Sequence, residues 1–137
     1  MDGYRLTTDV AVRFSDTDAL GHVNNANYLS FLESARIDYL RRVLGRLKVE
    51  DFGVIIARVE IDYKSPAYHH ETLTVGCRVG EVGGASIKMD YRIEDKATGR
   101  LIAEAKSVMV AFDYALGRPV RVSEEWRSKM EDFDGIA

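Results

Sequence analysis

Apolar and polar residues alternate with a period of two in five segments of this chain. The segments are 4–14, 55–63, 73–79, 85–93 and 101–112. Alternation of this kind is typical of β-strands that have one face in the core and one face in water. The segment at 101–112 is apolar on both faces near its end, which indicates a strand in the interior of a sheet.

The alternation also predicts which side chains share a buried face. In the first segment these are Tyr4, Leu6, Val10, Val12 and Phe14. In the second segment they are Ile55, Ala57, Val59, Ile61 and Tyr63. In the fourth segment they are Ala85, Ile87, Met89, Tyr91 and Ile93. We expect each set to face the core, because burial of apolar surface is the dominant favourable term in folding.

The segment 25–44 has the spacing of an amphipathic helix. Its apolar positions include Tyr28, Phe31, Leu32, Ala35, Tyr39 and Val43. Gaps of three and four residues place such side chains on one face of a helix. The side chain of Asn24 or of Asn25 could cap the start by accepting a hydrogen bond from an unpaired backbone N–H. We expect a second, short amphipathic helix near 123–131.

The predicted order is one strand, a long helix and four further strands. Glycine-containing turns at 81–86 and 95–100 predict hairpins between consecutive strands. The helix is the only sizeable apolar cover for the dry faces of the strands, and its length of ~30 Å matches that of a ten-residue strand. We therefore predict an α+β fold, in which a curved, five-stranded antiparallel sheet wraps around one long central helix. It forms a single domain over 1–137, with its core at about 4–113.

The composition of the 137 residues is that of an ordinary globular protein. Hydrophobic residues make up 46% and charged residues 30%, and the formal net charge is -3. The clustered basic footprint of a nucleic-acid-binding protein is missing, and no apolar run approaches the ~20 residues that span a membrane. The N-terminus lacks the pattern of a secretion signal. The single cysteine, Cys77, lies on an apolar strand face, and we expect an inert core residue in a reducing, cytoplasmic protein.

The stretch DTDALGHVNN at 16–25 places two carboxylates, a histidine and two asparagines directly before the predicted helix. The first N–H groups of a helix lack partners and carry partial positive charge, so they can polarise a carbonyl oxygen. Asp18 could act as a nucleophile or as a base on water, and His22 could orient a substrate oxygen or donate to it. Gly21 permits the tight turn that brings both side chains to one point. This combination points to acyl transfer.

The same residue types also have a purely structural interpretation. Asp, Asn and Gly are the usual residues of turns and helix caps, so Asp16 is as suited to holding the loop as to acting in chemistry. We expect His69 and His70 to be solvated residues of the turn at 64–71, because no third ligand at a sensible spacing completes a metal site. The spacing alone leaves both catalysis and capping open.

The longer stretch DTDALGHVNNANYLSFLESAR at 16–36 resembles the signature of the hotdog-fold acyl-CoA thioesterases, in the 4-hydroxybenzoyl-CoA thioesterase-like family. The predicted order of strands and helix is also the hotdog order, so the resemblance extends to about residue 113. It implies an enzyme that hydrolyses an acyl-CoA to a free acid and coenzyme A. It implies no metal and no bound cofactor, because coenzyme A is part of the substrate.

The resemblance further implies a homodimer or homotetramer with its sites at the dimer interface. This agrees with the sequence pattern, because the predicted sheet has open edges and one helix leaves apolar surface uncovered. We expect no partnership with nucleic acid or with a membrane.

The resemblance assigns roles position by position. Asp18 matches the catalytic aspartate, as nucleophile or general base, and a backbone N–H at or next to Asn25 matches the donor to the oxyanion. His22 and Asn24 match positions that lie near the thioester in many relatives. Two further positions that match the motif are Tyr28, which would pack beneath the site, and the acidic helix position Glu33.

Basic residues are the remaining candidates for substrate binding. The side chains that could meet the phosphates of coenzyme A are Lys64, Lys88, Arg92 and Arg118. For each of them the alternative is an ordinary solvated position on the surface.

Two other functions are compatible with the same fold. Hotdog proteins also serve as enoyl-CoA hydratases and acyl-carrier-protein dehydratases, which likewise use an acid and a histidine, although the GHVNN continuation favours a thioesterase. The third candidate is a module that binds acyl-CoA without turnover, and the presence of Asp18 argues against it.

Overall fold

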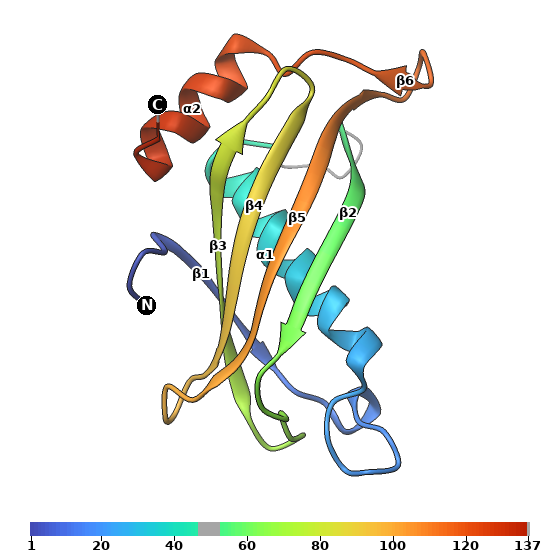
Figure 1. Ribbon diagram of the computed structural model, residues 1–137, viewed down its shortest axis with the longest axis vertical. Coiled ribbons are helices and arrows are strands. Elements are labelled where there is room, and N and C mark those ends of the chain that lie inside the picture. The colour runs from blue at the N-terminus through green and yellow to red at the C-terminus, as the bar shows by residue number, and fades with distance from the viewer. Residues whose placement is uncertain (47–52, 137) are drawn as a thin grey trace.

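The computed structural model describes residues 1–46 and 53–136. Its elements in chain order are β1 (Leu6–Ala11), the 3-10 turns η1 (Phe14–Asp16) and η2 (Asn25–Asn27), α1 (Tyr28–Arg42), β2 (Val54–Tyr63), β3 (Thr72–Val82), β4 (Ser86–Asp95), β5 (Leu101–Asp113), β6 (Arg118–Pro119) and α2 (Glu124–Asp134). The strands form an antiparallel sheet in the order β1-β3-β4-β5-β2, and the short β6 pairs with β5 (Figure 1). The expected order of elements is confirmed, with β6 as an additional two-residue strand.

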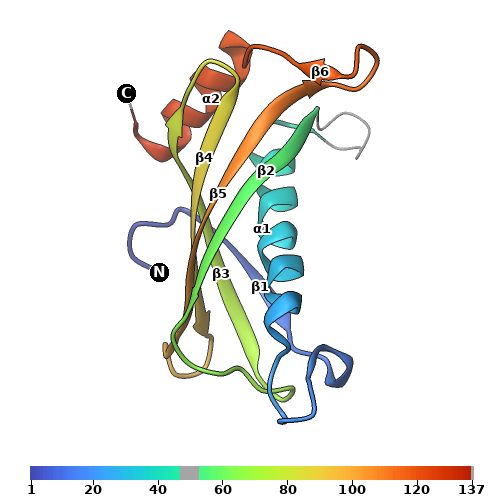
Figure 2. The ribbon, with the colours of Figure 1, turned by 45° about the vertical axis from the view of Figure 1, so that its right-hand side comes forward.

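Helix α1 lies across one face of the curled sheet and packs against β3 and β1 (Figure 2). Leu32, Ala35 and Tyr39 on the helix are each 0% exposed, as are Val75 and Ile93 on the sheet. The apolar positions that the 3.6-residue and two-residue periods single out therefore meet in one core. The predicted hotdog architecture, a curled antiparallel sheet around one long helix, is confirmed. In the part of the chain described, no helix is long and apolar enough to cross a membrane.

The long helix begins where its sequence predicts, but its first turn is tighter than an α-helix. Asn24 is the cap: its Oδ1 accepts a hydrogen bond from the N–H of Ala26 at 3.0 Å. The turn η2 follows, and α1 continues from it to Arg42. Of the two residues expected to cap the helix, Asn24 is the one that does so, and Asn25 is the first residue of the turn.

The prediction that all five apolar residues of the first segment face the core is wrong for the two at its ends, Tyr4 and Phe14. Phe14 is 78% exposed, because the chain leaves the sheet after Ala11 and turns through η1. Tyr4 lies on the outer face of the sheet, away from α1, with the guanidinium of Arg78 4.6 Å from the centre of its ring. Gly76 makes room for this ring, since a Cβ there would come within 2.8 Å of Tyr4 Cγ.

A β-bulge at Ala57 inverts the face predicted for the start of β2. The register between β2 and β5 shifts at this residue. Beyond the bulge Val59 lies opposite the buried Ser107, whereas before it Ile55 lies opposite Val110 on the other face. One extra residue in a strand reverses the side-chain alternation, so a sequence read with a strict period of two assigns Ile55 to the wrong side.

Helix α2 forms at the expected place and runs to Asp134, beyond the predicted end near residue 131. Ser123 caps its start by accepting from the N–H of Trp126 at 3.2 Å. Gly135 ends it with a φ of 66°, a left-handed conformation in which glycine is unstrained.

Asp134 is one of the residues that attach α2 to the rest of the fold, together with Arg127 and the buried Trp126 and Met130. Its Oδ2 accepts from the hydroxyl of Tyr39 on α1 at 2.5 Å and from the N–H of Val79 on β3 at 2.9 Å. The register between β3 and β4 shifts directly after Val79, so this carboxylate satisfies backbone at a bulge that the ladder leaves irregular.

Candidate active site

The segment between β1 and α1 is held in place by Asp16, whose carboxylate is buried. Its Oδ2 accepts from the N–H of Arg13 at 2.8 Å, and its Oδ1 accepts from the guanidinium of Arg13 at 2.9 Å. Asn27 Nδ2 donates to the carbonyl oxygen and to Oδ1 of Asp16, each at 3.2 Å. The hydrogen bond with the Arg13 side chain is the main cause that lowers the pKa of Asp16. Asp16 therefore holds the loop, which is one of the two roles considered for it.

Asp18 is the first residue of the turn in a small hairpin. Thr17 and Val23 form a β-bridge, and the N–H of Asp18 donates to the carbonyl of His22 at 2.9 Å. Gly21 adopts a φ of 86°, and its N–H donates to the carbonyl of Asp18 at 3.1 Å. The chain thus makes the tight turn expected at Gly21. The turn brings the side chains of Asp18 and His22 close to each other.

The carboxylate of Asp18 is accessible, in contrast to that of Asp16. Its Oδ1 accepts from the N–H of Leu20 at 2.8 Å. Its Oδ2 lies 3.9 Å from Nδ1 of His22, and the two side chains are 31% and 32% exposed. An oriented carboxylate with one oxygen facing an imidazole can attack a carbonyl carbon or take a proton from water.

The turn η2, which follows the loop and leads into α1, carries backbone N–H groups at the start of the helix. The N–H of Ala26 donates to Asn24 Oδ1, and the N–H of Asn27 donates to the carbonyl of Asn24 at 2.9 Å. Within residues 1–46 and 53–136, the N–H of Asn25 makes no hydrogen bond. It is a first-turn donor of the kind that can polarise a substrate oxygen.

The turn at 64–70 is hydrogen-bonded to the loop at Val23 and holds that part of the loop in place. The carbonyl of Ala67 accepts from the N–H of Val23 at 2.8 Å. Arg100 secures the turn, since it donates to the carbonyl of Pro66 at 3.0 Å and forms an ion pair with Glu71 at 2.9 Å. The sequence does not predict this role of Arg100, because 29 residues separate Arg100 from Glu71 and no local pattern joins them.

The three histidines of the chain gather at this turn together with two aromatic rings. His22 meets Tyr68 edge-on with ring centres 6.5 Å apart, and Tyr68 stacks on His70 at 6.0 Å. His69 meets Phe14 edge-on at 5.9 Å. His69 and His70 are exposed residues of the turn, as expected. No group of three or more His, Cys, Asp or Glu side chains in the described residues is placed to hold a metal ion.

Tyr28, the first residue of α1, is buried at the start of the helix. It is 2% exposed, and burial raises the pKa of its phenol. Its ring meets those of Phe31 and Tyr63 edge-on, with centres 5.8 Å and 5.1 Å apart.

The remaining candidate residues are not all near the loop. Glu33 is exposed on α1, and Lys64 directly follows β2 at the end of the sheet that carries the loop. Lys88 is on the outer face of β4, where it forms an ion pair with Glu81 at 2.9 Å. The structure therefore does not bring Lys88 together with Asp18.

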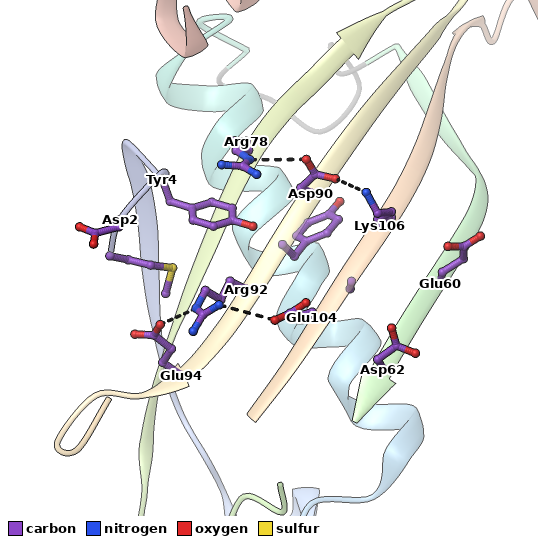
Figure 3. Close-up of a pocket in the computed structure, with 13 residues that line it drawn as sticks. Asp2, Tyr4, Glu60, Asp62, Arg78, Asp90, Arg92, Glu94, Glu104 and Lys106 are labelled. Carbon is purple, nitrogen blue, oxygen red and sulfur yellow. Dashed lines mark hydrogen bonds and ion pairs between the residues drawn. The ribbon is translucent and has the colours of Figure 1, made fainter. Parts of the chain in front are cut away.

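A charged hollow of about 750 Å³ lies on the outer face of the sheet (Figure 3). None of the residues that line it belongs to the segment 16–25. Asp90 forms ion pairs with Arg78 and Lys106, at 3.4 Å and 3.2 Å, and Arg92 forms one with Glu94 at 2.6 Å. Cross-strand ion pairs of this kind suit a solvated sheet face, and the basic groups in the hollow are already neutralised.

Cys77 is 0% exposed, and burial raises the pKa of its thiol. Because the thiolate is the reactive form of cysteine, this environment makes Cys77 inert at neutral pH, as expected for a core residue.

The arrangement therefore combines an accessible carboxylate, an imidazole and an unused helix N–H within ten residues. Such a set can hold an acyl carbonyl by its oxygen and bring a carboxylate or a water molecule to its carbon. These are the kinds of group that acyl-transfer chemistry on a hotdog fold uses.

A comparison with protein families shows which family the chain belongs to. Residues 12–130 match the thioesterase-like superfamily, and the chain belongs to that family. The acyl-CoA thioesterase YbgC of Haemophilus influenzae is 31% identical over 120 residues, which cover 85% of this chain and 87% of that protein. The long-chain acyl-CoA thioesterase FadM of Escherichia coli is 28% identical over 130 residues, which cover 93% and 98%.

Solved structures show the same fold. A thioesterase from Thermus thermophilus, crystallised with coenzyme A and zinc, has a TM-score of 0.91 at 34% identity and covers 100% of this chain and 99% of its own. A thioesterase of Bacillus stearothermophilus, itself described as predicted, has a TM-score of 0.85 at 28% identity, with coverage of 93% and 94%.

Proposed function

We propose that this protein is an acyl-CoA thioesterase, which hydrolyses an acyl-CoA to a free carboxylic acid and coenzyme A. The observation that carries the proposal is that one short segment holds both the accessible Asp18 carboxylate and an N–H, that of Asn25 at the start of the long helix, which makes no hydrogen bond within the described residues. The names of the relatives FadM and YbgC, and the coenzyme A bound to the Thermus protein, support the same reaction.

In the proposed mechanism the thioester carbonyl oxygen accepts from the N–H of Asn25, and the positive end of the helix stabilises the negative charge that develops there. Asp18 then acts in one of two ways. As a general base it takes a proton from water, whose oxygen bonds to the carbonyl carbon while the C–S bond breaks. As a nucleophile its own oxygen forms that bond, and water cleaves the resulting anhydride. In both cases the coenzyme A sulfur leaves as a thiolate and is protonated.

His22 and Asn24 have supporting roles in this proposal. His22 lies beside the carboxylate and donates to a substrate oxygen, while Asn24 holds the turn whose N–H polarises the carbonyl. Lys64 is the basic candidate for the phosphates of coenzyme A at this end of the sheet, whereas Lys88 on the outer face is not.

We further propose that the active form is a homodimer or homotetramer. Strand β2 forms one edge of the sheet, so its outer backbone groups can pair with another chain. Apolar side chains on β2 and on the neighbouring face of α1 are also open, with Ile56 38%, Tyr63 44% and Leu29 45% exposed. Sedimentation equilibrium of the native protein tests this directly, and a monomer at micromolar concentration would contradict it.

The first experiment is thiol release from short-chain, long-chain and aromatic acyl-CoAs by the native protein, by Asp18→Asn and by Asp132→Asn. We expect Asp18→Asn to lose at least about a hundredfold in kcat, as removal of an acid–base or nucleophilic group does. Asp132→Asn, which changes an exposed carboxylate on α2, should match the native protein. A protein-only blank removes any signal from Cys77.

Three outcomes would contradict the proposal in different ways. Full activity of Asp18→Asn would contradict the assigned role of Asp18. Loss of enoyl absorbance from a crotonyl thioester, without thiol release, would indicate a hydratase. Tight binding of an acyl-CoA with neither reaction would indicate a binding module.

A further inference from the structure

One side chain outside the 16–25 segment contacts the turn that carries the proposed oxyanion donor. The hydroxyl of Tyr63, the last residue of β2, donates to the carbonyl oxygen of Asn25 at 2.8 Å. Its ring meets the ring of Tyr28, the first residue of α1, with centres 5.1 Å apart. Tyr63 thus contacts the helix start through both its polar and its apolar parts.

This contact is important because η2 is exposed and short. None of its three residues is buried. Two hydrogen bonds to Asp16 act as ties that hold the ends of the turn. On the N-terminal side the N–H of Asn24 donates to the carbonyl of Asp16 at 2.8 Å, and on the C-terminal side the side chain of Asn27 donates to the same carbonyl. Between these two ties, the hydrogen bond from Tyr63 holds the peptide group that follows Asn25.

A hydrogen bond to the carbonyl of Asn25 restricts rotation of that peptide plane. The N–H of Asn25 belongs to the preceding peptide group, whose carbonyl oxygen on Asn24 accepts from the N–H of Asn27 at 2.9 Å. The φ and ψ angles at Asn25 set the angle between these two peptide planes, so the bond from Tyr63 and the bond from Asn27 together fix the direction of the Asn25 N–H. A donor to an oxyanion is effective only when it is held in position before the charge develops, because reorientation during the reaction cancels part of the gain.

We propose that Tyr63 is a positioning residue for the acyl-transfer site, which aims the N–H of Asn25 at the thioester carbonyl. This inference rests on the proposed function, since it concerns the carbonyl-polarising element of that reaction. Tyr63 does not touch the reacting atoms and acts through Asn25. Its role joins the far end of β2 to the start of α1, two elements that are 38 residues apart at this contact.

The chain offers a matched control at the other end of the same strand. The hydroxyl of Tyr114 donates to the carbonyl of Val54, the first residue of β2, also at 2.8 Å. Tyr63 and Tyr114 are both exposed, by 44% and 64%, and both donate to a backbone carbonyl. Replacement of either residue by Phe removes one hydrogen bond of the same kind and keeps the ring.

The experiment compares Tyr63→Phe with Tyr114→Phe in two measurements. The first is the steady-state kinetics of the acyl-CoA that the native protein hydrolyses best. We expect Tyr63→Phe to lower kcat by about three- to tenfold with KM little changed, which is the range of one ordinary hydrogen bond. Tyr114→Phe should leave both constants unchanged.

The second measurement is the infrared stretching frequency of a ¹³C-labelled thioester carbonyl bound to the protein. Asp18→Asn serves as the background, because it prevents turnover during the measurement. In this background we expect the bound carbonyl to absorb at lower frequency than the free thioester. Adding Tyr63→Phe should move the frequency back toward the free value, whereas adding Tyr114→Phe should not. A purely structural role of Tyr63 would not change this frequency.

The outcomes separate this inference from the proposed function. Suppose that the native protein hydrolyses acyl-CoA. If Tyr63→Phe then has the native kcat, or if adding Tyr63→Phe to Asp18→Asn leaves the frequency of the bound carbonyl as it is in Asp18→Asn alone, the positioning role is wrong and the thioesterase stands. If the two Phe variants lose activity equally, the effect is general loss of β2 stability and the inference is also wrong. If the native protein neither hydrolyses nor binds any acyl-CoA, the proposed function itself fails.

Discussion

The side-chain amide of Asn27 lies 3.2 Å from both the carbonyl oxygen and Oδ1 of Asp16, and it donates to both. This pair joins the chain that leaves β1 to the start of the long helix. Asp18, two residues further on, has an accessible carboxylate, whose contacts in the described part of the chain are the N–H of Leu20 and the imidazole of His22. The two aspartates of the DTD motif therefore differ in environment, since Asp16 holds the loop and Asp18 has a carboxylate that is accessible to a substrate.

Asp16→Asn should lower stability, and Asp18→Asn should not. Asn at position 16 loses the charge-assisted bonds with Arg13, which are worth about 1.5–3 kcal/mol together with the cost of unsatisfied buried groups. Asp18 is partly exposed, so its replacement should change the free energy of unfolding by less than ~0.5 kcal/mol. Urea unfolding followed by circular dichroism measures both. Equal stability of the two variants would contradict this division of roles.

The lowered pKa of Asp16 predicts a loss of stability in acid. The ionised carboxylate is bound more tightly in the folded state, by Arg13 first, so its pKa is lower there than in the unfolded chain. Its contribution is fully present above the unfolded pKa of about 3.9 and is lost as the pH falls through the lower folded pKa. The free energy of unfolding measured from about pH 5 to about pH 2 should fall less steeply in Asp16→Asn than in the native protein. Parallel curves would show that Asp16 is not responsible.

Asp134→Ala should loosen the C-terminal end of α2 without changing the chemistry. It leaves the hydroxyl of Tyr39 and the N–H of Val79 without their acceptor, at a cost of about 1–3 kcal/mol in stability. Amide exchange at Val79 should accelerate, while kcat per folded molecule stays at the native value. Asp132→Ala, at an exposed position of the same helix, is the control. Slow exchange at Val79 in Asp134→Ala would mean that the carboxylate is not its main protection.

Gly76→Ala should displace the N-terminal segment from the outer face of the sheet. The new methyl group would overlap Met1 Sδ, the end of a flexible side chain that can move away, and would lie 2.8 Å from Cγ of the Tyr4 ring, which is too close for two carbon atoms. We expect a loss of about 1–3 kcal/mol, the usual cost of an overpacked contact. Because the clash involves the Tyr4 ring, the double variant Tyr4→Ala/Gly76→Ala should be more stable than the sum of the single changes predicts. Strict additivity, measured by thermal unfolding, would contradict the clash.

The sequence predicts the parts of this molecule that depend on neighbours along the chain. The periods of two and of three to four residues locate the sheet and α1, and the motif at 16–25 locates the loop. The bulge at Ala57 was not predictable, because one inserted residue leaves no mark on composition while it inverts the strand face before it. Spacing alone could not separate Asp16 from Asp18 either, since both carboxylates have the same chemistry until burial distinguishes them.

Contacts between distant segments account for the rest. Tyr63 reads as an ordinary end of an alternating strand, and only the fold brings its hydroxyl to Asn25. Arg100 reads as part of a hairpin turn, and only the fold brings it to Glu71 and the turn beside the loop. Such pairs depend on strand order and curl, which are set by the whole core and not by any local pattern.

Strands β1 and β2 are the two outermost strands in the order of the main sheet, yet both reach the same loop. The chain leaving β1 carries Asp16, and the end of β2 carries Tyr63, which donates to Asn25. The distance between these two margins depends on how strongly the three strands between them curve. A substitution in that middle region that flattens the sheet would draw Tyr63 away from Asn25 without touching either residue. Under the proposed role of Tyr63, the turnover rate should therefore depend on the curvature of the whole sheet as well as on the groups around the substrate.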